Sequence, residues 1–284
     1  MTYTAGIDVG STYTKAVVID ADKRILGKAM TNTGFQLTKS ARSALDEALA
    51  EAGLSSEGLA YTVATGFGRH QIPFADVTAT DLTASARGVS TLFPRTHTIL
   101  DVGGQTMKAI RLDDETKVKS FRLNDKCAAG TGAFLEKTAR YMGFSTEEIG
   151  PLAATSKGAV PISGVCAVFA ESEVINHLSL GAAPSDIMFG AISSLVDRSV
   201  QLMKRVQMEP EFTLIGGILR FPSMAAVVRR ELGSEVNVPA GELVQFTTAF
   251  GAAILGQVRL HKIEGQPADG QPADLETLSA PAFA

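Results

Sequence analysis

Residues 7–18, IDVGSTYTKAVV, and residues 100–111, LDVGGQTMKAIR, decide the fold of this chain. The two stretches align without a gap on Asp, Val, Gly and Lys, and most neighbouring apolar positions match in kind. Each stretch predicts a short strand, a glycine-containing turn and a second, antiparallel strand. Since the same pattern occurs twice in one chain, the sequence predicts a duplicated β-rich unit and two related lobes.

The rest of the chain predicts helices separated by further glycine turns. The helix over residues 40–52 is the clearest, because Leu45 and Leu49 lie four residues apart and Gly53 provides a C-cap. Strands that run into glycine turns are predicted at residues 61–68 and 212–220. Further helices are predicted at residues 81–88, 222–232 and 246–260, and over most of residues 121–207 with a break at 158–164.

These elements predict an α/β protein with two lobes, a closing helix and a tail. The first lobe is expected at residues 1–95 and the second at residues 96–246. We expect residues 247–262 to form a helix that packs back on the first lobe. Residues 263–284, with their tandem GQPAD repeat, are expected to form a flexible tail.

Composition and charge exclude several classes of protein. The 284 residues are 45% hydrophobic and 20% charged, which suits a folded protein with a large core. A formal net charge of −4, from 26 basic and 30 acidic residues, is not the footprint of a nucleic-acid binder. The amino terminus lacks the plan of a secretory signal, and no apolar run approaches the roughly 18 residues of a membrane span. We therefore expect a cytoplasmic protein.

Two common nucleotide-binding signatures are absent from the chain. No stretch matches the GxxxxGK[ST] pattern of a P-loop. The GFG at residues 66–68 does not extend to GxGxxG, because Gln71 occupies the last position. Neither a P-loop nor a dinucleotide-binding turn is therefore expected.

The two hairpins instead carry residues that suit a site for Mg²⁺ and phosphate. Successive backbone N–H groups of a glycine turn can surround an anion, and an Asp at the end of the preceding strand can hold a hydrated Mg²⁺. The alternative interpretation is two ordinary Asp/Gly hairpins. The candidates are Asp8, Gly10, Ser11, Thr12 and Lys15 in the first copy, and Asp101, Gly103, Gly104, Gln105 and Lys108 in the second.

The stretches GIDVGSTYTK, LDVGGQTMK and LIGGILR resemble the first phosphate, second phosphate and adenosine motifs of the actin, sugar-kinase and heat-shock-chaperone ATPase superfamily. The resemblance implies two ribonuclease-H-like lobes with ATP in the cleft. It also implies that Asp8 and Asp101 organise Mg²⁺ beside the phosphates. Gly216 and Gly217 would then lie against adenosine, and Gln105 would position the attacking water.

Two cysteines are too few for a disulfide scaffold, but both stand where a metal-ligating thiolate is favoured. Cys127 precedes a glycine-containing entry into a predicted helix, and Cys166 stands at or just before another. The dipole and the unpaired N–H groups of a helix amino end favour a thiolate. Because a 4Fe–4S cluster ordinarily takes four thiolates, two chains would be needed to complete one. The alternative is that both cysteines are small buried residues.

NDKCAAGTGAFLE and CAVFAESEVI closely resemble the two cluster-binding segments of the ATP-dependent electron activators that serve 2-hydroxyacyl-CoA dehydratases and class I benzoyl-CoA reductases. The resemblance implies one 4Fe–4S cluster held by Cys127 and Cys166 of each of two subunits. It implies ATP or ADP and Mg²⁺ as further ligands. The implied partners are a homologous ATPase chain, in a homodimer or a pseudo-symmetric heterodimer, and a ferredoxin as electron donor.

Within this family the sequence favours the smaller ATPase subunit of a benzoyl-CoA reductase, on the stretches TGFGRHQIPFADVTATDLTASARG and GGILRFPSM. Thr106 stands where the dehydratase activators usually carry an acid, so the chain departs from them at that position. The expected activity is ATP hydrolysis coupled to one-electron transfer for aromatic ring reduction, with benzoyl-CoA-binding reductase subunits as partners. The alternatives are an activator of a 2-hydroxyacyl-CoA dehydratase and, from other classes, a small-molecule kinase or an actin-like scaffold.

Overall fold

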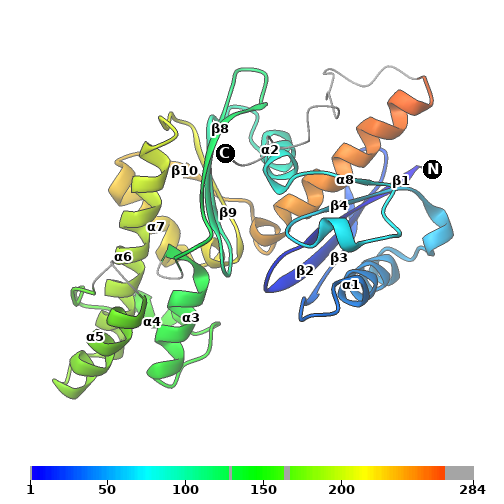
Figure 1. Cartoon of the computed structure of the whole chain (residues 1–284). Coiled ribbons are helices and arrows are strands. Elements are labelled where there is room, and N and C mark those ends of the chain that lie inside the picture. Colours follow the sequence, from blue (N-terminus) through cyan, green and yellow to red (C-terminus); the bar gives the residue numbers. More distant parts are fainter. Residues whose placement is uncertain (1, 128–129, 163–166, 266–284) are drawn as a thin grey trace. The chain divides into compact units, whose positions relative to one another are not determined.

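A computed structural model describes residues 2–127, 130–162 and 167–265 of the chain (Figure 1). These residues form two compact units. Unit 1 contains the chain up to Pro94 together with the segment from Phe246, and unit 2 spans Arg95–Gln245. Each unit is built around its own five-stranded sheet.

The sheet of unit 1 has the strand order β3-β2-β1-β4-β5. Its first three strands are antiparallel neighbours, whereas β4 runs parallel to β1 and β5 runs parallel to β4. The strands are β1 (Tyr3–Val9), β2 (Tyr13–Ile19), β3 (Ile25–Asn32), β4 (Leu59–Thr65) and β5 (Val77–Thr78). The helices are α1 (Leu37–Ala52), α2 (Asp81–Leu92) and most of α8 (Leu243–Ile263), with short 3-10 turns at Ser56–Gly58 and Arg69–Gln71.

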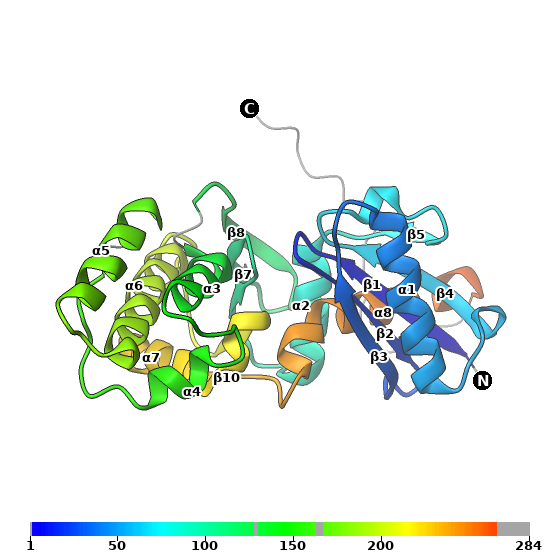
Figure 2. The same cartoon turned by 90° about the horizontal axis from the view of Figure 1, so that it is seen from below.

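Helices α1 and α8 cover opposite faces of this sheet (Figure 2). Ile7 of β1 is fully buried in one core cluster with Leu45 of α1. Because side chains alternate along a strand, Gly6 faces the other side. There α8 approaches so closely that a Cβ added at Gly6 would lie 2.0 Å from the carbonyl oxygen of Ala249. The small residues of α8 therefore permit the close packing that their sequence suggested.

The sheet of unit 2 repeats the topology of the first. Counted from the start of each unit, both sheets have the order 3-2-1-4-5, with the same parallel and antiparallel pairs. The duplication predicted from residues 7–18 and 100–111 is therefore confirmed in the strand topology. The strands are β6 (Thr98–Val102), β7 (Met107–Leu112), β8 (Val118–Asn124), β9 (Phe212–Ile215) and β10 (Val236–Asn237).

Unit 2 carries a larger set of helices, of which α6 is the longest. One stripe of α6, including Ile187, Leu195 and Val196, is fully buried in a cluster with Leu100 of β6 and Val228 of α7. The helices are α3 (Gly132–Tyr141), α4 (Ile149–Ala154), α5 (Ala167–Ser179), α6 (Pro184–Lys204) and α7 (Pro222–Leu232), and a 3-10 turn, η4, spans Gly217–Arg220.

Four strands were missing from the sequence-based prediction: β3, β8 and the two-residue strands β5 and β10. The sequence analysis assigned no element to β3 and expected residues from Phe121 onward to be mostly helical, whereas β8 extends to Asn124. Strand β8 pairs with β7 alone and lies at the edge of its sheet. None of its residues is fully buried, so the strand lacks the buried apolar face by which a half-buried strand is recognised.

Helix α8 is longer and more apolar than the sequence analysis allowed. It begins at Leu243, and its best 18-residue window has a mean hydropathy of 1.2, which meets the length and composition of a membrane span. However, 83% of that window is buried inside the structure. This burial is what a core helix of a globular unit requires.

Candidate functional site

Each unit pairs an aspartate with a lysine directly across its first hairpin. Asp8 lies opposite Lys15 in the register of β1 and β2, and Asp101 lies opposite Lys108 in that of β6 and β7. The distance from Nζ to Oδ2 is 3.7 Å in the first pair and 3.1 Å in the second. None of the four side chains is more than 15% exposed, so solvent screens both ion pairs only partly.

The turn of each hairpin is closed by the same backbone hydrogen bond. The N–H of Gly10 donates to the carbonyl oxygen of Tyr13 at 3.2 Å, and the N–H of Gly103 donates to that of Thr106 at 2.8 Å. Within each unit, the structure therefore brings the predicted phosphate-binding residues together beside their aspartate. The turn residues are all at least partly exposed: Gly10, Ser11 and Thr12 in unit 1, and Gly103, Gly104 and Gln105 in unit 2.

A glycine with positive φ lies against each aspartate. Gly66 follows β4 with a φ of +86°, and Gly216 follows β9 with a φ of +104°. A Cβ added at Gly66 would lie 2.5 Å from Oδ1 of Asp8, and one at Gly216 would lie 2.8 Å from Oδ1 of Asp101. Each carboxylate therefore packs against bare backbone, which only glycine allows in this conformation.

Gly66 is a site residue that the sequence analysis missed. Gly66-Phe67-Gly68 was tested only as a dinucleotide-binding turn, whereas Gly216-Gly217 was assigned to an adenosine motif. The topology makes Gly66 and Gly216 equivalent, because each follows the strand that runs parallel to the Asp-bearing strand. The signal that would have found Gly66 is a glycine directly after the fourth strand of each repeat.

The second turn is bonded directly to the start of α3. The N–H of Gly132 donates to the carbonyl oxygen of Gly103 at 2.9 Å, and the N–H of Ala133 donates to that of Gly104 at 2.7 Å. The sequence analysis expected such helix N–H groups to be unpaired beside a thiolate, and for these two groups that expectation is wrong. The turn carbonyls satisfy them, so the turn and α3 form one hydrogen-bonded piece.

Cys127 lies in the loop between β8 and α3 as a partly exposed residue that forms no disulfide. Asn124 holds the backbone of Cys127 from both sides. Its Nδ2 donates to the Cys127 carbonyl oxygen at 3.1 Å, and its Oδ1 accepts from the Cys127 N–H at 3.3 Å. From α6, Arg198 brings Nη1 to 3.4 Å from the Cys127 Sγ. The other predicted ligand, Cys166, lies outside the described residues.

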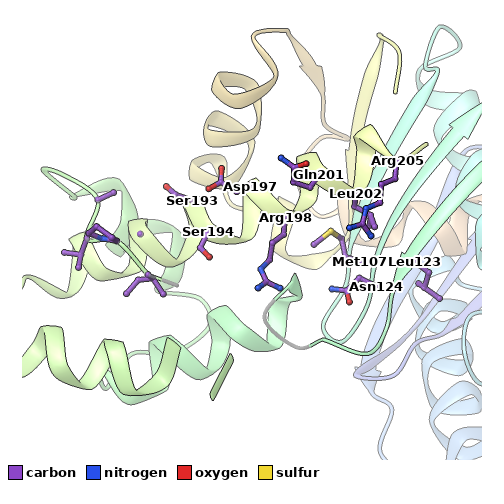
Figure 3. Close-up of a pocket in the computed structure, with 15 residues that line it drawn as sticks. Met107, Leu123, Asn124, Ser193, Ser194, Asp197, Arg198, Gln201, Leu202 and Arg205 are labelled. Carbon is purple, nitrogen blue, oxygen red and sulfur yellow. The ribbon is translucent and has the colours of Figure 1, made fainter. Parts of the chain in front are cut away.

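A cavity of about 690 Å³ opens beside this loop in unit 2 (Figure 3). Figure 3 shows Arg198 projecting from α6 towards the end of β8, where Asn124 lies. Residues 159–162 form the opposite wall, and the backbone N–H of Val160 donates to the carbonyl oxygen of Asp186 at 3.1 Å. The cavity therefore lies between α6, the end of β8 and the segment that precedes Cys166 in the sequence.

Asp186 fixes the start of that segment through its side chain. Its Oδ1 accepts from the Ser156 hydroxyl at 2.8 Å and from the backbone N–H of Lys157 at 2.8 Å. The hydrogen bond from Ser156 and then that from Lys157 lower the pKa of the Asp186 carboxyl below its usual 3.8. The ionised carboxylate is thus the form that holds residues 156–158 in place.

The possible metal ligands, Asp8, Asp101 and Cys127, suit a hydrated Mg²⁺ and a cluster shared between chains better than a metal ion held by protein side chains alone. Among residues 2–127, 130–162 and 167–265, no group of three or more His, Cys, Asp or Glu side chains could hold a metal ion. Each unit offers one carboxylate, Asp8 or Asp101, and Mg²⁺ suits such a site because it keeps several waters and binds phosphate oxygens. Cys127 is a partly exposed residue that offers one sulfur on a braced loop, which fits a ligand of a cluster completed by other thiols.

Two sheets of identical topology with repeated Asp/Lys/Gly turns define a two-lobed α/β fold of the kind found in actin-like sugar kinases. The structure of a ROK-family glucokinase from Streptomyces griseus, in complex with glucose and AMPPNP, has the same fold. Its TM-score is 0.57 at 15% sequence identity, and the match covers 90% of this chain and 99% of that one. The fold class predicted from the sequence is confirmed.

This chain belongs to the BadF/BadG/BcrA/BcrD ATPase family, whose model matches residues 5–256. It is 40% identical to the activator of lactoyl-CoA dehydratase of Anaerotignum propionicum, over 89% of this chain and 96% of that protein. It is 31% identical to one of the benzoyl-CoA reductase subunits of Thauera aromatica, over 93% of this chain and 96% of that protein. The structure of the activator of the 2-hydroxyisocaproyl-CoA dehydratase from Clostridium difficile with bound ADPNP matches with a TM-score of 0.89 at 34% identity, covering 95% and 100%. The family resemblance noted in the sequence is therefore confirmed.

Replacing Gly66 or Gly216 with Ala tests the packing of the two aspartates. We expect each variant to lose more than about 2 kcal/mol of unfolding free energy, because the new Cβ collides with a carboxylate and with backbone. Gly143→Ala is the control, since Gly143 also has a positive φ of +83° but no atom within 4 Å of its added Cβ. It should lose about 1 kcal/mol in urea unfolding. Equal losses in all three variants would contradict the proposed contact.

The Asp186 carboxylate should make stability depend on pH. Because its pKa is lowered by folding, its contribution is present above the unfolded value of 3.8 and is lost as the pH falls through the folded-state pKa. We expect Asp186→Asn to lower the melting temperature at pH 7. The difference in melting temperature between this variant and wild type should narrow as the pH falls from about 5 to about 2. Asp46→Asn, at an exposed position of α1, controls for the loss of one negative charge. A gap that is constant with pH would refute the assignment.

Proposed function

We propose that this chain is the ATP-hydrolysing, iron–sulfur electron activator of a 2-hydroxyacyl-CoA dehydratase. It would couple ATP hydrolysis to the delivery of single electrons, taken from a ferredoxin, to its partner enzyme. The observation that carries this proposal is the likeness to dehydratase activators along nearly their whole length, in sequence and in structure.

The relatives favour this function over the benzoyl-CoA reductase role that the sequence analysis preferred. The dehydratase activator is more similar in sequence than the reductase relative. The departure at Thr106 was an argument for the reductase. However, Thr106 takes part in the turn through its backbone carbonyl, which any residue supplies. The reductase role remains the second candidate because the likeness to that relative also extends over nearly the whole chain.

We assign the nucleotide to the turns of the two units. Gly10, Ser11, Thr12 and Lys15 in unit 1, and Gly103 and Gly104 in unit 2, would bind phosphate oxygens. Asp8 and Asp101 would bind Mg²⁺ directly or through its waters. Gly216 and Gly217 would lie against adenosine, and the exposed Gln105 would orient the attacking water. The relative with bound ADPNP supports a nucleotide ligand for this family.

The bonds between the second turn and α3 supply a route from nucleotide to cysteine. A change of phosphate at the turn would move the carbonyl groups of Gly103 and Gly104, which accept hydrogen bonds from the first N–H groups of α3. Cys127 lies in the loop just before that helix. The turn is therefore the element through which hydrolysis would alter the surroundings of the sulfur.

Cys127 and Cys166 of two chains would together hold one 4Fe–4S cluster. When bound, such a cluster supplies a one-electron carrier of low reduction potential. Cys127 contributes one sulfur, and Asn124 fixes the backbone that carries it. The second chain is a copy of this one or a homologous ATPase.

Anaerobic purification followed by iron and ATPase assays separates the two proposed sites. We expect about four iron atoms per two wild-type chains. Cys127→Ser should lose the iron but still bind ADP. Asp101→Asn should keep the iron but lose at least about tenfold in ATP turnover, because Mg²⁺ loses its protein ligand in unit 2.

Two exposed aspartates supply the controls: Asp125→Asn and Asp114→Asn should both behave as wild type. A full complement of iron in Cys127→Ser would refute the role of this cysteine. An iron-free wild-type protein that phosphorylates a small hydroxyl compound would establish the kinase alternative instead.

The electron acceptor is tested by complementation with purified partner enzymes. With ATP and a reduced ferredoxin, the wild-type chain should restore the dehydration of a 2-hydroxyacyl-CoA by an activator-free dehydratase. Asp101→Asn, loaded with iron, should not. Reduction of benzoyl-CoA in the presence of reductase subunits, without any effect on the dehydratase, would decide for the second candidate.

A further inference from the structure

The contact between Arg198 and Cys127 joins two residues that lie 71 positions apart in the sequence. The guanidinium Nη1 lies 3.4 Å from Sγ, which is within the range of an N–H···S hydrogen bond. Arg198 is partly buried, so its charge is less screened than that of a surface arginine. Among the described residues, the sulfur of Cys127 is the one hydrogen-bond acceptor of this guanidinium.

The geometry around Cys127 gives this contact a specific role. The N–H groups of Gly132 and Ala133 at the start of α3 are already bonded to the second turn, so they do not donate to the sulfur. The Asn124 side chain bonds only to the backbone of Cys127, so the Cys127 side chain can contact other groups. Arg198 is therefore the positive group that faces the sulfur from the described part of the chain. The neighbouring charges of Asp125 and Lys126 are both exposed and opposite in sign.

We propose that Arg198 is a positioning residue that holds the Cys127 sulfur through an N–H···S hydrogen bond and makes the cluster bound there easier to reduce. Reduction adds one negative charge to the cluster and its sulfur ligands. A guanidinium beside one ligand stabilises that charge, and hydrogen bonds to cluster sulfurs raise the reduction potential. The cluster part of this inference rests on the proposed function, whereas the contact itself does not.

The contact is tested first in the metal-free, full-length protein by alkylation. Iodoacetate is an anion and iodoacetamide is neutral, so the ratio of their rates at Cys127 reports the positive charge beside the sulfur. We expect Arg198→Met to lower this ratio by about threefold or more, as removal of a unit charge at roughly 5 Å predicts even in water. Peptide mapping by mass spectrometry distinguishes Cys127 from Cys166.

Two further variants separate the contact from general effects of structure and charge. Arg205→Met removes the same charge from the far end of the same cavity, seven residues further along, and should leave the ratio unchanged. Arg198→Lys keeps the charge, so its ratio of iodoacetate to iodoacetamide rates should lie between those of wild type and Arg198→Met. This variant also tests the contact if Arg198→Met does not fold. An unchanged ratio in Arg198→Met, or an equal fall in Arg205→Met, would overturn the proposed contact.

The second readout is the reduction potential of the reconstituted cluster, measured by titration with EPR detection. Arg198→Met should shift the potential to a more negative value and alter the EPR signal of the reduced cluster, while Arg205→Met should match wild type. The same potential in Arg198→Met and wild type would overturn the tuning role. If the wild-type protein takes up no cluster at all, the proposed function fails, and the alkylation ratio still decides the contact.

Discussion

A carboxylate shielded from water at the end of a strand is costly unless a cation faces it, and this chain meets that requirement twice with a lysine directly across the hairpin. The glycine turn sets the register that brings the two charges together, since a slip of one residue would send them to opposite faces of the sheet. A second glycine, after the parallel neighbouring strand, leaves room for the carboxylate. The topology, the turn and the charge pair therefore depend on one another in both units.

The chemistry of the second unit extends from that same turn. Its carbonyl groups are not left to water but bind the first N–H groups of α3, and the loop before α3 carries Cys127. The turn proposed to bind phosphate is in this way joined, through two main-chain hydrogen bonds, to the helix that follows the loop proposed to hold metal. Such a connection suits a protein whose two sites are proposed to influence one another.

The sequence was informative where the contacts are local. The hairpins, the helix capped by Gly53 and the helix Pro222–Leu232 follow from patterns within a few residues, and the Asp8–Lys15 pair is implied by the hairpin itself. Gly66 could not be assigned because its partner, Asp8, becomes its neighbour only through the parallel pairing of β1 and β4. Strand β8 was missed because an exposed edge strand has no buried face, and a buried face is what produces a recognisable pattern of apolar residues. The contact of Arg198 with Cys127 could not be predicted either, since nothing in the sequence of an amphipathic helix indicates which of its polar residues faces a distant thiol.

The two bonds that join the turn to α3 involve only main-chain atoms. Their strength does not depend on which side chains the turn residues or the outer face of α3 carry, so substitutions there can accumulate without breaking the connection. An inserted or deleted residue between Cys127 and Gly132 is different, because it changes the spacing between the sulfur and its anchor whatever its chemical nature. Over evolutionary time, selection should therefore act on the length of this stretch more strongly than on the polarity of its surroundings.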